Sequence, residues 1–99
     1  MLDTKQTHAA PHTVRDDTPL IERTQQGKPE AFSLLFSKYH PRLYRHIHGR
    51  VRVPEVAKDL TQETWLKAFR DIDSFRGTSG FYSWVYQIAE NVTTDFFRK

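Results

Sequence analysis

The chain has 99 residues, which is the length of one small domain and leaves little room for a second. It contains no cysteine, so a disulfide framework, a thiol nucleophile and a thiolate metal site are all excluded. Lysine and arginine total 15 and aspartate and glutamate total 12, and the formal net charge of +3 fits a nucleic-acid partner without requiring one. No apolar run approaches the roughly 18 residues of a membrane span, and the N-terminus has no secretory apolar segment, so we expect no membrane insertion and a cytoplasmic location.

The charge is distributed unevenly along the chain. Residues 20–53 carry seven basic and two acidic side chains, whereas residues 54–73 carry three basic and five acidic ones. A basic block followed by an acidic block indicates two different contact surfaces. On charge alone, ordinary solvated helix faces explain the pattern equally well.

The first predicted element is a short helix behind a tail. Residues 1–17 are rich in Thr, His, Asp and Ala and have no usable periodicity, so we predict a disordered N-terminal tail. Thr18 is a good N-cap and Pro19 suits the first turn of a helix. Because Gly27 is suited to end a helix, the pattern predicts the first helix over residues 19–26.

The second helix is predicted over residues 29–49, beginning at Pro29. Pro41 lies inside its apolar stripe, so we expect a kink or a brief break there. The apolar positions at helical spacing are Ala31, Phe32, Leu35, Phe36, Tyr39, Leu43, Tyr44 and Ile47.

Two further helices are predicted over residues 54–72 and 80–97, separated by a loop rich in glycine and hydroxyl residues. Ser79 is expected to cap the last helix. No segment alternates at period two, so we predict an all-α fold, a compact bundle of about four helices. The helices over residues 29–49, 54–72 and 80–97 are expected to share a core of Phe32, Phe36, Leu60, Phe69, Trp84, Ile88 and Val92.

Patterns of catalysis and metal binding are absent from the sequence. It has neither a phosphate-binding glycine motif nor an HExxH pair. His46 and His48 are two residues apart and point in different directions on a helix, so surface histidines explain them better than a metal site. No spacing of Ser, His and Asp suggests a triad. We therefore expect no enzyme activity and no cofactor.

Aromatic residues flank the loop that precedes the last helix. Phe75 and Arg76 come before its glycines, and Tyr82 and Tyr86 follow, four residues apart. Aromatic rings beside arginine and small polar residues suit stacking on unpaired bases. The alternative is that these rings thicken a small core, and composition alone favours that alternative.

The order of three motifs identifies a resemblance. They are GKPEAF (residues 27–32), DLTQETWLKAF (residues 59–69) and FRGTSGFYSWVYQIAEN (residues 75–91). In this order the chain closely resembles the conserved second region of bacterial sigma factors, in the extracytoplasmic-function group. The resemblance covers residues 18–99, which we predict to be one sigma region 2 domain.

The resemblance implies a polymerase-binding helix. In the family, the corresponding helix docks on the clamp helices of the beta-prime subunit of RNA polymerase. The implied contact residues in this chain are Asp59, Gln62 and Glu63, with Leu66 and Arg70 as neighbours on the same helix face.

The resemblance also implies a site for promoter DNA. In the family, the loop and the following helix capture a base flipped from the non-template strand of the minus-ten element. Stacking is implied for Phe75 and Tyr86, and reading of a base edge for Asn91. The remaining implied DNA-binding residues are Arg76, Gly77, Thr78, Ser79 and Tyr82. Glu90 departs from the pattern, since many relatives carry a basic or neutral residue before the asparagine.

The family has a second, helix-turn-helix domain that reads the minus-thirty-five element, and nothing follows Lys99, so we expect a fragment that holds the N-terminal domain only.

The sequence leaves two alternative functions open. The main alternative is a helical protein-interaction module that is held by an anti-sigma factor and does not read DNA. A stand-alone helix-turn-helix reader of duplex DNA is weaker, because the last helix has too little positive charge.

Overall fold

The structure, a computed structural model, describes residues 17–99 of the chain. For residues 1–16, the prediction of a disordered tail lies outside the described residues. The described part contains no strand, which confirms the all-α prediction, and no helix bound differs from its predicted position by more than two residues. The elements are α2 (Thr18–Gln25), α3 (Pro29–Val51), α4 (Pro54–Asp71), the short 3-10 helix η2 (Ile72–Ser74) and α5 (Phe81–Arg98).

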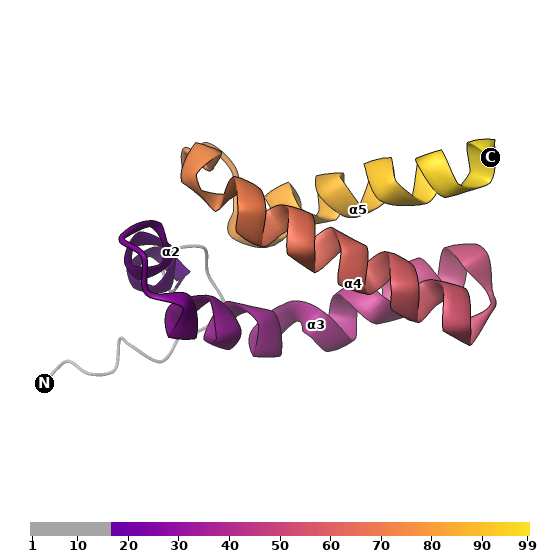
Figure 1. The fold of residues 1–99 in the computed structure, drawn as a ribbon, viewed down its shortest axis with the longest axis horizontal. Helices are drawn as coiled ribbons and strands as arrows, with labels where there is room; N and C mark the ends of the chain where they lie inside the picture. Colours follow the sequence, from indigo (N-terminus) through magenta and orange to yellow (C-terminus); the bar gives the residue numbers. More distant parts are fainter. Residues whose placement is uncertain (1–16) are drawn as a thin grey trace, which may run out of the picture.

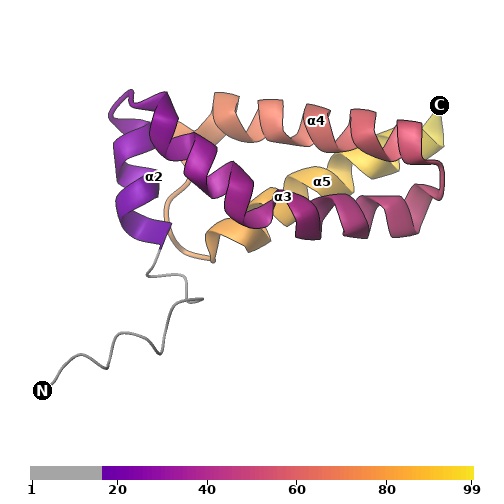
Figure 2. The same cartoon turned by 90° about the horizontal axis from the view of Figure 1, so that it is seen from below.

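The long helices α3, α4 and α5 form the body of the molecule. The chain runs along α3, turns back along α4 and returns along α5, so α3 and α4 are antiparallel neighbours (Figure 1). Helix α2 packs across the end of the body at which the loop between α4 and α5 lies (Figure 2). Helix α3 contacts α2, α4 and α5, and α2 also contacts η2. Between residues 17 and 99, no helix has the length and hydropathy that crossing a membrane requires.

Backbone conformation explains where the helices begin and end. Proline lies in the first turn of α2, α3 and α4, where its missing N–H costs no hydrogen bond. Gly27 has a φ of +90° after α2, as expected of the residue that ends a helix. Arg52 adopts the left-handed conformation after α3, with a φ of 65°, and its N–H donates to the His48 carbonyl at 2.8 Å.

Helix α3 is continuous through Pro41, so of the expected kink or brief break, the break does not occur. Proline cannot donate to the carbonyl one turn earlier, and this loss favours a bend. The ribbon of α3 changes direction near its middle (Figure 2).

Two predicted details at helix starts are wrong. Asp17 does not belong to a disordered tail, because its carboxylate is buried and accepts hydrogen bonds from Lys38 and from the Tyr39 hydroxyl. Ser79 does not cap α5: the residue before the helix is Gly80, and the Ser79 hydroxyl donates to the Gly80 carbonyl at 3.4 Å.

The core lies where α3, α4 and α5 meet. Its largest fully buried side chains include Phe81, Leu35, Leu43 and Ile47. Three of the predicted core residues are buried, namely Phe32, Leu60 and Val92. Trp84 and Ile88 are partly buried and pack against its edge.

The prediction that Phe36 and Phe69 are core residues is wrong. Their side chains are 36% and 44% exposed. Both side chains lie where α3 and α4 meet, but they line the surface groove between the two helices and do not enter the core. Periodicity identifies the face of a helix, whereas the depth of a residue on that face depends on how closely the helices pack.

Candidate functional site

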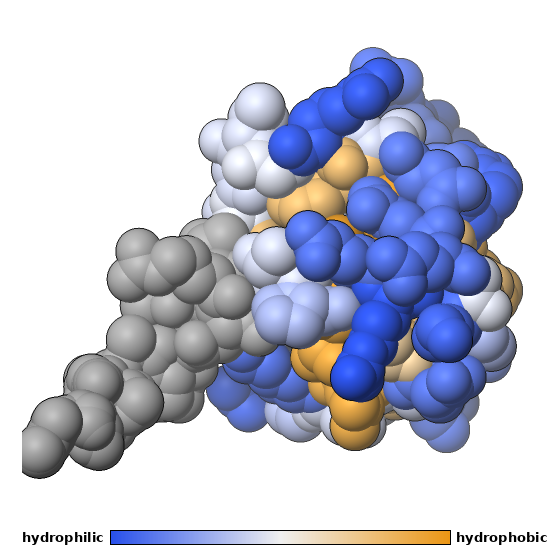
Figure 3. Space-filling model, turned by 90° about the vertical axis from the view of Figure 1, so that its left-hand side faces the viewer, coloured by the Kyte–Doolittle hydropathy of each residue, from blue (hydrophilic) through white to orange (hydrophobic). Residues whose placement is uncertain are grey.

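The loop of residues 75–80 joins η2 to α5 and contains most of the predicted DNA-binding residues. Arg76, Gly77, Thr78 and Ser79 are exposed. Gly77 has a φ of +79°, a conformation that glycine adopts without strain, so this residue type is needed for the turn. Polar residues cover most of the end of the molecule at which α2 lies, with smaller hydrophobic areas between them (Figure 3).

Phe75 is the exception in this loop. Its side chain is only 8% exposed and packs against Phe81 and Trp84, with ring centroids 6.0 Å and 5.3 Å away. In this structure the ring is not open to a base. Phe75 instead fixes the start of the loop to the core.

Helix α2 holds the loop through a residue that the sequence did not indicate. The Gln25 side-chain amide donates to the carbonyls of Ile72 and Phe75, at 2.9 Å and 3.2 Å. A small pocket of about 150 Å³ lies between α2 and the loop. It is lined by Thr18, Ile21, Glu22, Gln25, Phe75, Arg76 and Gly77.

Tyr82 and Tyr86 form an aromatic row along the contact between α5 and α3. Their ring centroids are 6.2 Å apart, and both side chains are half-buried. Tyr39 of α3 continues the row next to Tyr82 at 5.3 Å, and His46 continues it next to Tyr86 at 4.6 Å. The aromatic row, Tyr39, Tyr82, Tyr86 and His46, therefore joins two helices that are distant in sequence.

Positive charge accompanies the aromatic row. The Arg42 guanidinium lies 4.1 Å from the centroid of the Tyr82 ring, within the range of a cation–π contact. Burial raises the pKa of Tyr82, and the charges of Arg42 and Arg45 act in the opposite direction. Tyr82 is therefore a neutral phenol at physiological pH, with a hydroxyl that can donate a hydrogen bond.

Asn91 does not join Tyr86 in this structure. They are five positions apart on α5, so they point to different sides of the helix. Tyr86 faces α3, whereas Asn91 is exposed and lines a shallow depression between α4 and α5 together with Arg70. The three residues expected to line one pocket, Phe75, Tyr86 and Asn91, thus occupy three different surroundings.

The predicted polymerase-binding residues lie on the outside of α4. Asp59, Gln62, Glu63, Leu66 and Arg70 are all exposed. Leu66 is 67% exposed, so it adds apolar surface to this otherwise polar face. Arg70 forms a paired contact with Asp71, with two hydrogen bonds of 2.8 Å that raise the pKa of Arg70 and lower the pKa of Asp71.

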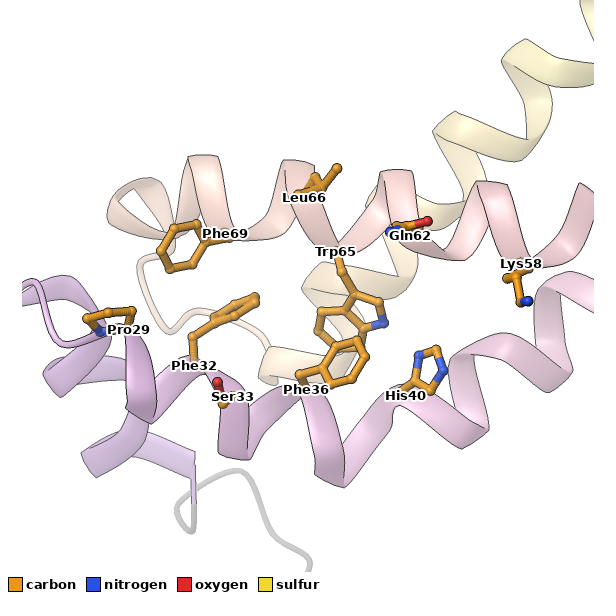
Figure 4. A pocket seen from close by; sticks show the side chains of 10 residues that line it. All are labelled: Pro29, Phe32, Ser33, Phe36, His40, Lys58, Gln62, Trp65, Leu66 and Phe69. Carbon is orange, nitrogen blue, oxygen red and sulfur yellow. The ribbon is translucent and has the colours of Figure 1, made fainter.

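An apolar groove of about 700 Å³ runs between α3 and α4 beside these residues (Figure 4). Trp65 points from α4 toward Phe36 on α3, and Phe69 faces Phe32 (Figure 4). Gln62 and Leu66 belong to both the groove and the predicted polymerase face. The groove is lined by Pro29, Phe32, Ser33, Phe36, His40, Lys58, Gln62, Trp65, Leu66 and Phe69.

Two buried nitrogens beside the groove lack a hydrogen-bond partner in the part of the chain that the structure describes. They are Nε1 of Trp65 and Nδ1 of His40. Buried polar groups are normally paired, because an unpaired donor or acceptor loses its hydration without compensation. Both atoms are covered by neighbouring atoms, so they are unpaired polar groups inside the α3–α4 contact.

Sequence reasoning missed Gln25, Arg42, His46 and the groove residues Phe36 and Phe69. Arg42 and His46 belong to the basic block of residues 20–53, so the charge pattern was the available signal for them. For Gln25 no signal existed, because its partners lie 47 and 50 residues away. Within residues 17–99, no three His, Cys, Asp or Glu side chains are grouped closely enough to hold a metal ion.

Comparison with known proteins agrees with the motifs. Residues 35–99 match the model of the Sigma-70 region 2 family. The chain therefore belongs to the sigma-70 region 2 family, and the resemblance indicated by its sequence motifs is confirmed.

Its relatives include sigma factors of the extracytoplasmic-function (ECF) group. The chain is 41% identical over 80 residues to the ECF RNA polymerase sigma-E factor of Haemophilus influenzae, an alignment that covers 81% of this chain and 42% of the relative. It is 42% identical over 79 residues to the RNA polymerase sigma-H factor of Pseudomonas aeruginosa, covering 80% of this chain and 41% of the relative. The chain thus spans about two-fifths of the length of these relatives.

A solved structure has a similar fold. It is the NMR structure of an engineered region 2 of sigmaE in complex with GTAAAA. The TM-score is 0.75 at 33% sequence identity, and the match covers 82% of this chain and 84% of the other.

Proposed function

We propose that this chain is the part of a sigma factor that docks on RNA polymerase and captures the non-template strand of the minus-ten promoter element. The observation that carries the proposal is the aromatic row with Arg42 beside an exposed loop, in a chain of the sigma-70 region 2 family. Rings and cations in one line suit a single strand, since bases stack on the rings and phosphates meet the cations. The chain itself carries no reaction in this proposal, and it would act in the cytoplasm.

The polymerase would dock on α4 and the groove beside it. Leu66 and the exposed rings of Phe36 and Phe69 supply an apolar centre, and Gln62, Asp59 and Glu63 supply a polar rim. Interfaces of this kind have an apolar core with charged residues at the edge. Relatives of the chain are named as RNA polymerase sigma factors, which supports polymerase as the partner of this surface. The clamp helices of the beta-prime subunit are the finer assignment that the family resemblance implies.

The DNA strand would lie over the loop and the aromatic row. Tyr82 and Tyr86 would stack on bases, and Arg76 would contact phosphate at the rim of the small pocket beside α2. The similar sigmaE domain was solved in complex with GTAAAA, which supports a single-stranded ligand of this type. Phe75 would act by holding the loop, because its ring is buried.

Binding of the chain to a single strand of sequence GTAAAA tests the DNA half of the proposal. Replacing Tyr86 by alanine should weaken binding by about ten- to a hundredfold, the loss expected for one stacked base. Tyr44→Ala is the matched control, since Tyr44 is a half-buried tyrosine of α3 that stacks on His48 outside the aromatic row. Equal affinities of the Tyr86→Ala and Tyr44→Ala variants would remove the aromatic row from the site.

An anti-sigma factor is a further proposed partner. It would cover the groove, the loop or both, and so compete with polymerase and DNA. If the chain bound neither a clamp-helix fragment nor GTAAAA, the alternative of a protein-interaction module without DNA reading would replace the main proposal.

A further inference from the structure

Glu90 forms the centre of a polar cluster between α3 and α5. Its carboxylate accepts a hydrogen bond from His46 Nε2 at 2.6 Å and another from Arg50 at 2.8 Å. The hydrogen bond from His46 is the main cause of a lowered pKa for Glu90, with Arg50 adding to it. The acid that departs from the family pattern is therefore ionised and paired inside this chain, and it does not face DNA as an isolated negative charge.

The same histidine touches the aromatic row. The His46 ring lies 4.6 Å from the Tyr86 ring, at an interplanar angle of 45°. Tyr86 also lies near Tyr82, with ring centroids 6.2 Å apart. Residues 82, 86 and 90 are four apart, so they lie on one face of α5. His46 of α3 contacts two of them, Tyr86 and Glu90.

We propose that His46 is a positioning residue for Tyr86, held in place by Glu90, so that the tyrosine ring is fixed before a base stacks on it. The inference rests on the proposed function, because it requires Tyr86 to meet an unpaired base. Accepting the Nε2 proton fixes both the tautomer and the orientation of the imidazole. A ring that is ordered before binding avoids the entropy cost of ordering it in the complex, so release of Tyr86 should weaken binding by about three- to tenfold.

A double-mutant cycle with a GTAAAA single strand separates this role from others. His46→Ala should weaken binding by about three- to tenfold when Tyr86 is present, and by less than about twofold in a Tyr86→Ala background. A histidine that contacted phosphate directly, or that only supported the fold, would weaken binding equally in both backgrounds. Arg50→Ala is the matched control, since it removes the other partner of Glu90 without touching Tyr86, and any effect should be equal in both backgrounds.

Conservative replacement of Glu90 provides a second readout. In Glu90→Gln the side-chain oxygen can still accept the proton of His46, so affinity for GTAAAA should stay within about twofold of the unchanged chain. Glu90→Ala cannot hold the ring and should reproduce the loss caused by His46→Ala. Thermal unfolding of each variant checks the fold, and His46→Asn replaces His46→Ala in the cycle if the alanine variant does not fold.

The possible failures are distinguishable. If Tyr86→Ala binds GTAAAA as tightly as the unchanged chain, the proposed DNA site is wrong. If Tyr86→Ala weakens binding but His46→Ala has no effect, or has the same effect in both backgrounds, only the positioning role is overturned. The same holds if the glutamine and alanine variants of Glu90 bind equally.

Discussion

Single charged residues at the contacts of α3 are paired within the molecule. Asp17 is held by Lys38 and Tyr39 near the middle of α3, and Glu90 is held by His46 and Arg50 near its C-terminal end. Each pair joins residues that are far apart in sequence, so it stabilises packing between elements and not a single helix. The positive charge that remains along α3 includes Arg42 and Arg45.

The lowered pKa of Glu90 predicts how stability depends on pH. A carboxyl group whose pKa is lower in the folded state stabilises the fold when it is ionised in both states. Its contribution should therefore be complete above its unperturbed pKa of 4.5 and be lost as the pH falls through the lower folded value. Denaturant unfolding of the chain and of Glu90→Gln, from about pH 3 to pH 7, measures this. The stability difference between the two should shrink toward acid pH, and a constant difference would contradict the assignment.

At the level of elements, α5 buries one face in the core and leaves the side chains of another face accessible. Phe81, Val85 and Ala89 are fully buried, whereas Tyr82 and Tyr86 lie at the α3 contact with part of each ring accessible. The loop before α5 is fixed at one end by Phe75 and from outside by Gln25. Burial of one face of α5 therefore determines which of its side chains remain accessible to a ligand.

Truncation of Phe81 tests this packing. Because the ring is completely buried, Phe81→Ala should reduce the free energy of unfolding by about 3–5 kcal/mol. Leu34→Ala is the control, since Leu34 is 56% exposed and its loss should cost less than about 1 kcal/mol. Denaturant unfolding gives both values, and a similar cost for the two variants would show that α5 is not anchored through Phe81.

Loss of the Gln25 contacts should loosen the loop without unfolding the bundle. Gln25→Ala removes two hydrogen bonds to backbone carbonyls, and each such bond contributes about 1 kcal/mol. Because the two bonds together contribute about 2 kcal/mol, we expect amide hydrogen exchange to accelerate by about thirtyfold in residues 72–77, with little change in α4. Exchange followed by mass spectrometry checks this, and uniform acceleration along the chain would indicate a global effect instead.

For the whole molecule, α3 separates the two proposed surfaces. The groove lies where α3 meets α4, and the aromatic row lies where α3 meets α5. Neither surface shares a residue with the other. The proposed polymerase site and the proposed DNA site therefore do not overlap.

Variants on the two surfaces should have separate effects. Leu66→Asp places a charge in the apolar part of the groove and should weaken binding to a beta-prime clamp-helix fragment by at least about tenfold, while leaving GTAAAA binding unchanged. Leu34→Asp is the matched control, because Leu34 is also an exposed leucine but lies outside the groove. Titrations with the fragment and with the single strand give both affinities. Equal loss in the two leucine variants would place the docking surface elsewhere.

The positions of the helices and the family could be predicted from the sequence. Proline at three helix starts, Gly27 after α2 and the apolar period of α5 are local signals, and they act within one or two helical turns. The exposure of the α4 residues was also predictable, because polar residues at three- and four-residue spacing share a solvent face.

Only the tertiary structure decided how deeply each side chain is buried, which polar groups pair, and which site residues lie next to one another. For Phe75 the sequence left both a stacking role and a core role open, and for Phe36 it predicted the core; the structure buries Phe75 and exposes Phe36. The sequence did not indicate that Asn91 turns away from Tyr86, or that Glu90 meets His46 across 44 residues of chain. These features depend on how closely and at what angle the helices pack, and that is set by the fit of many side chains together.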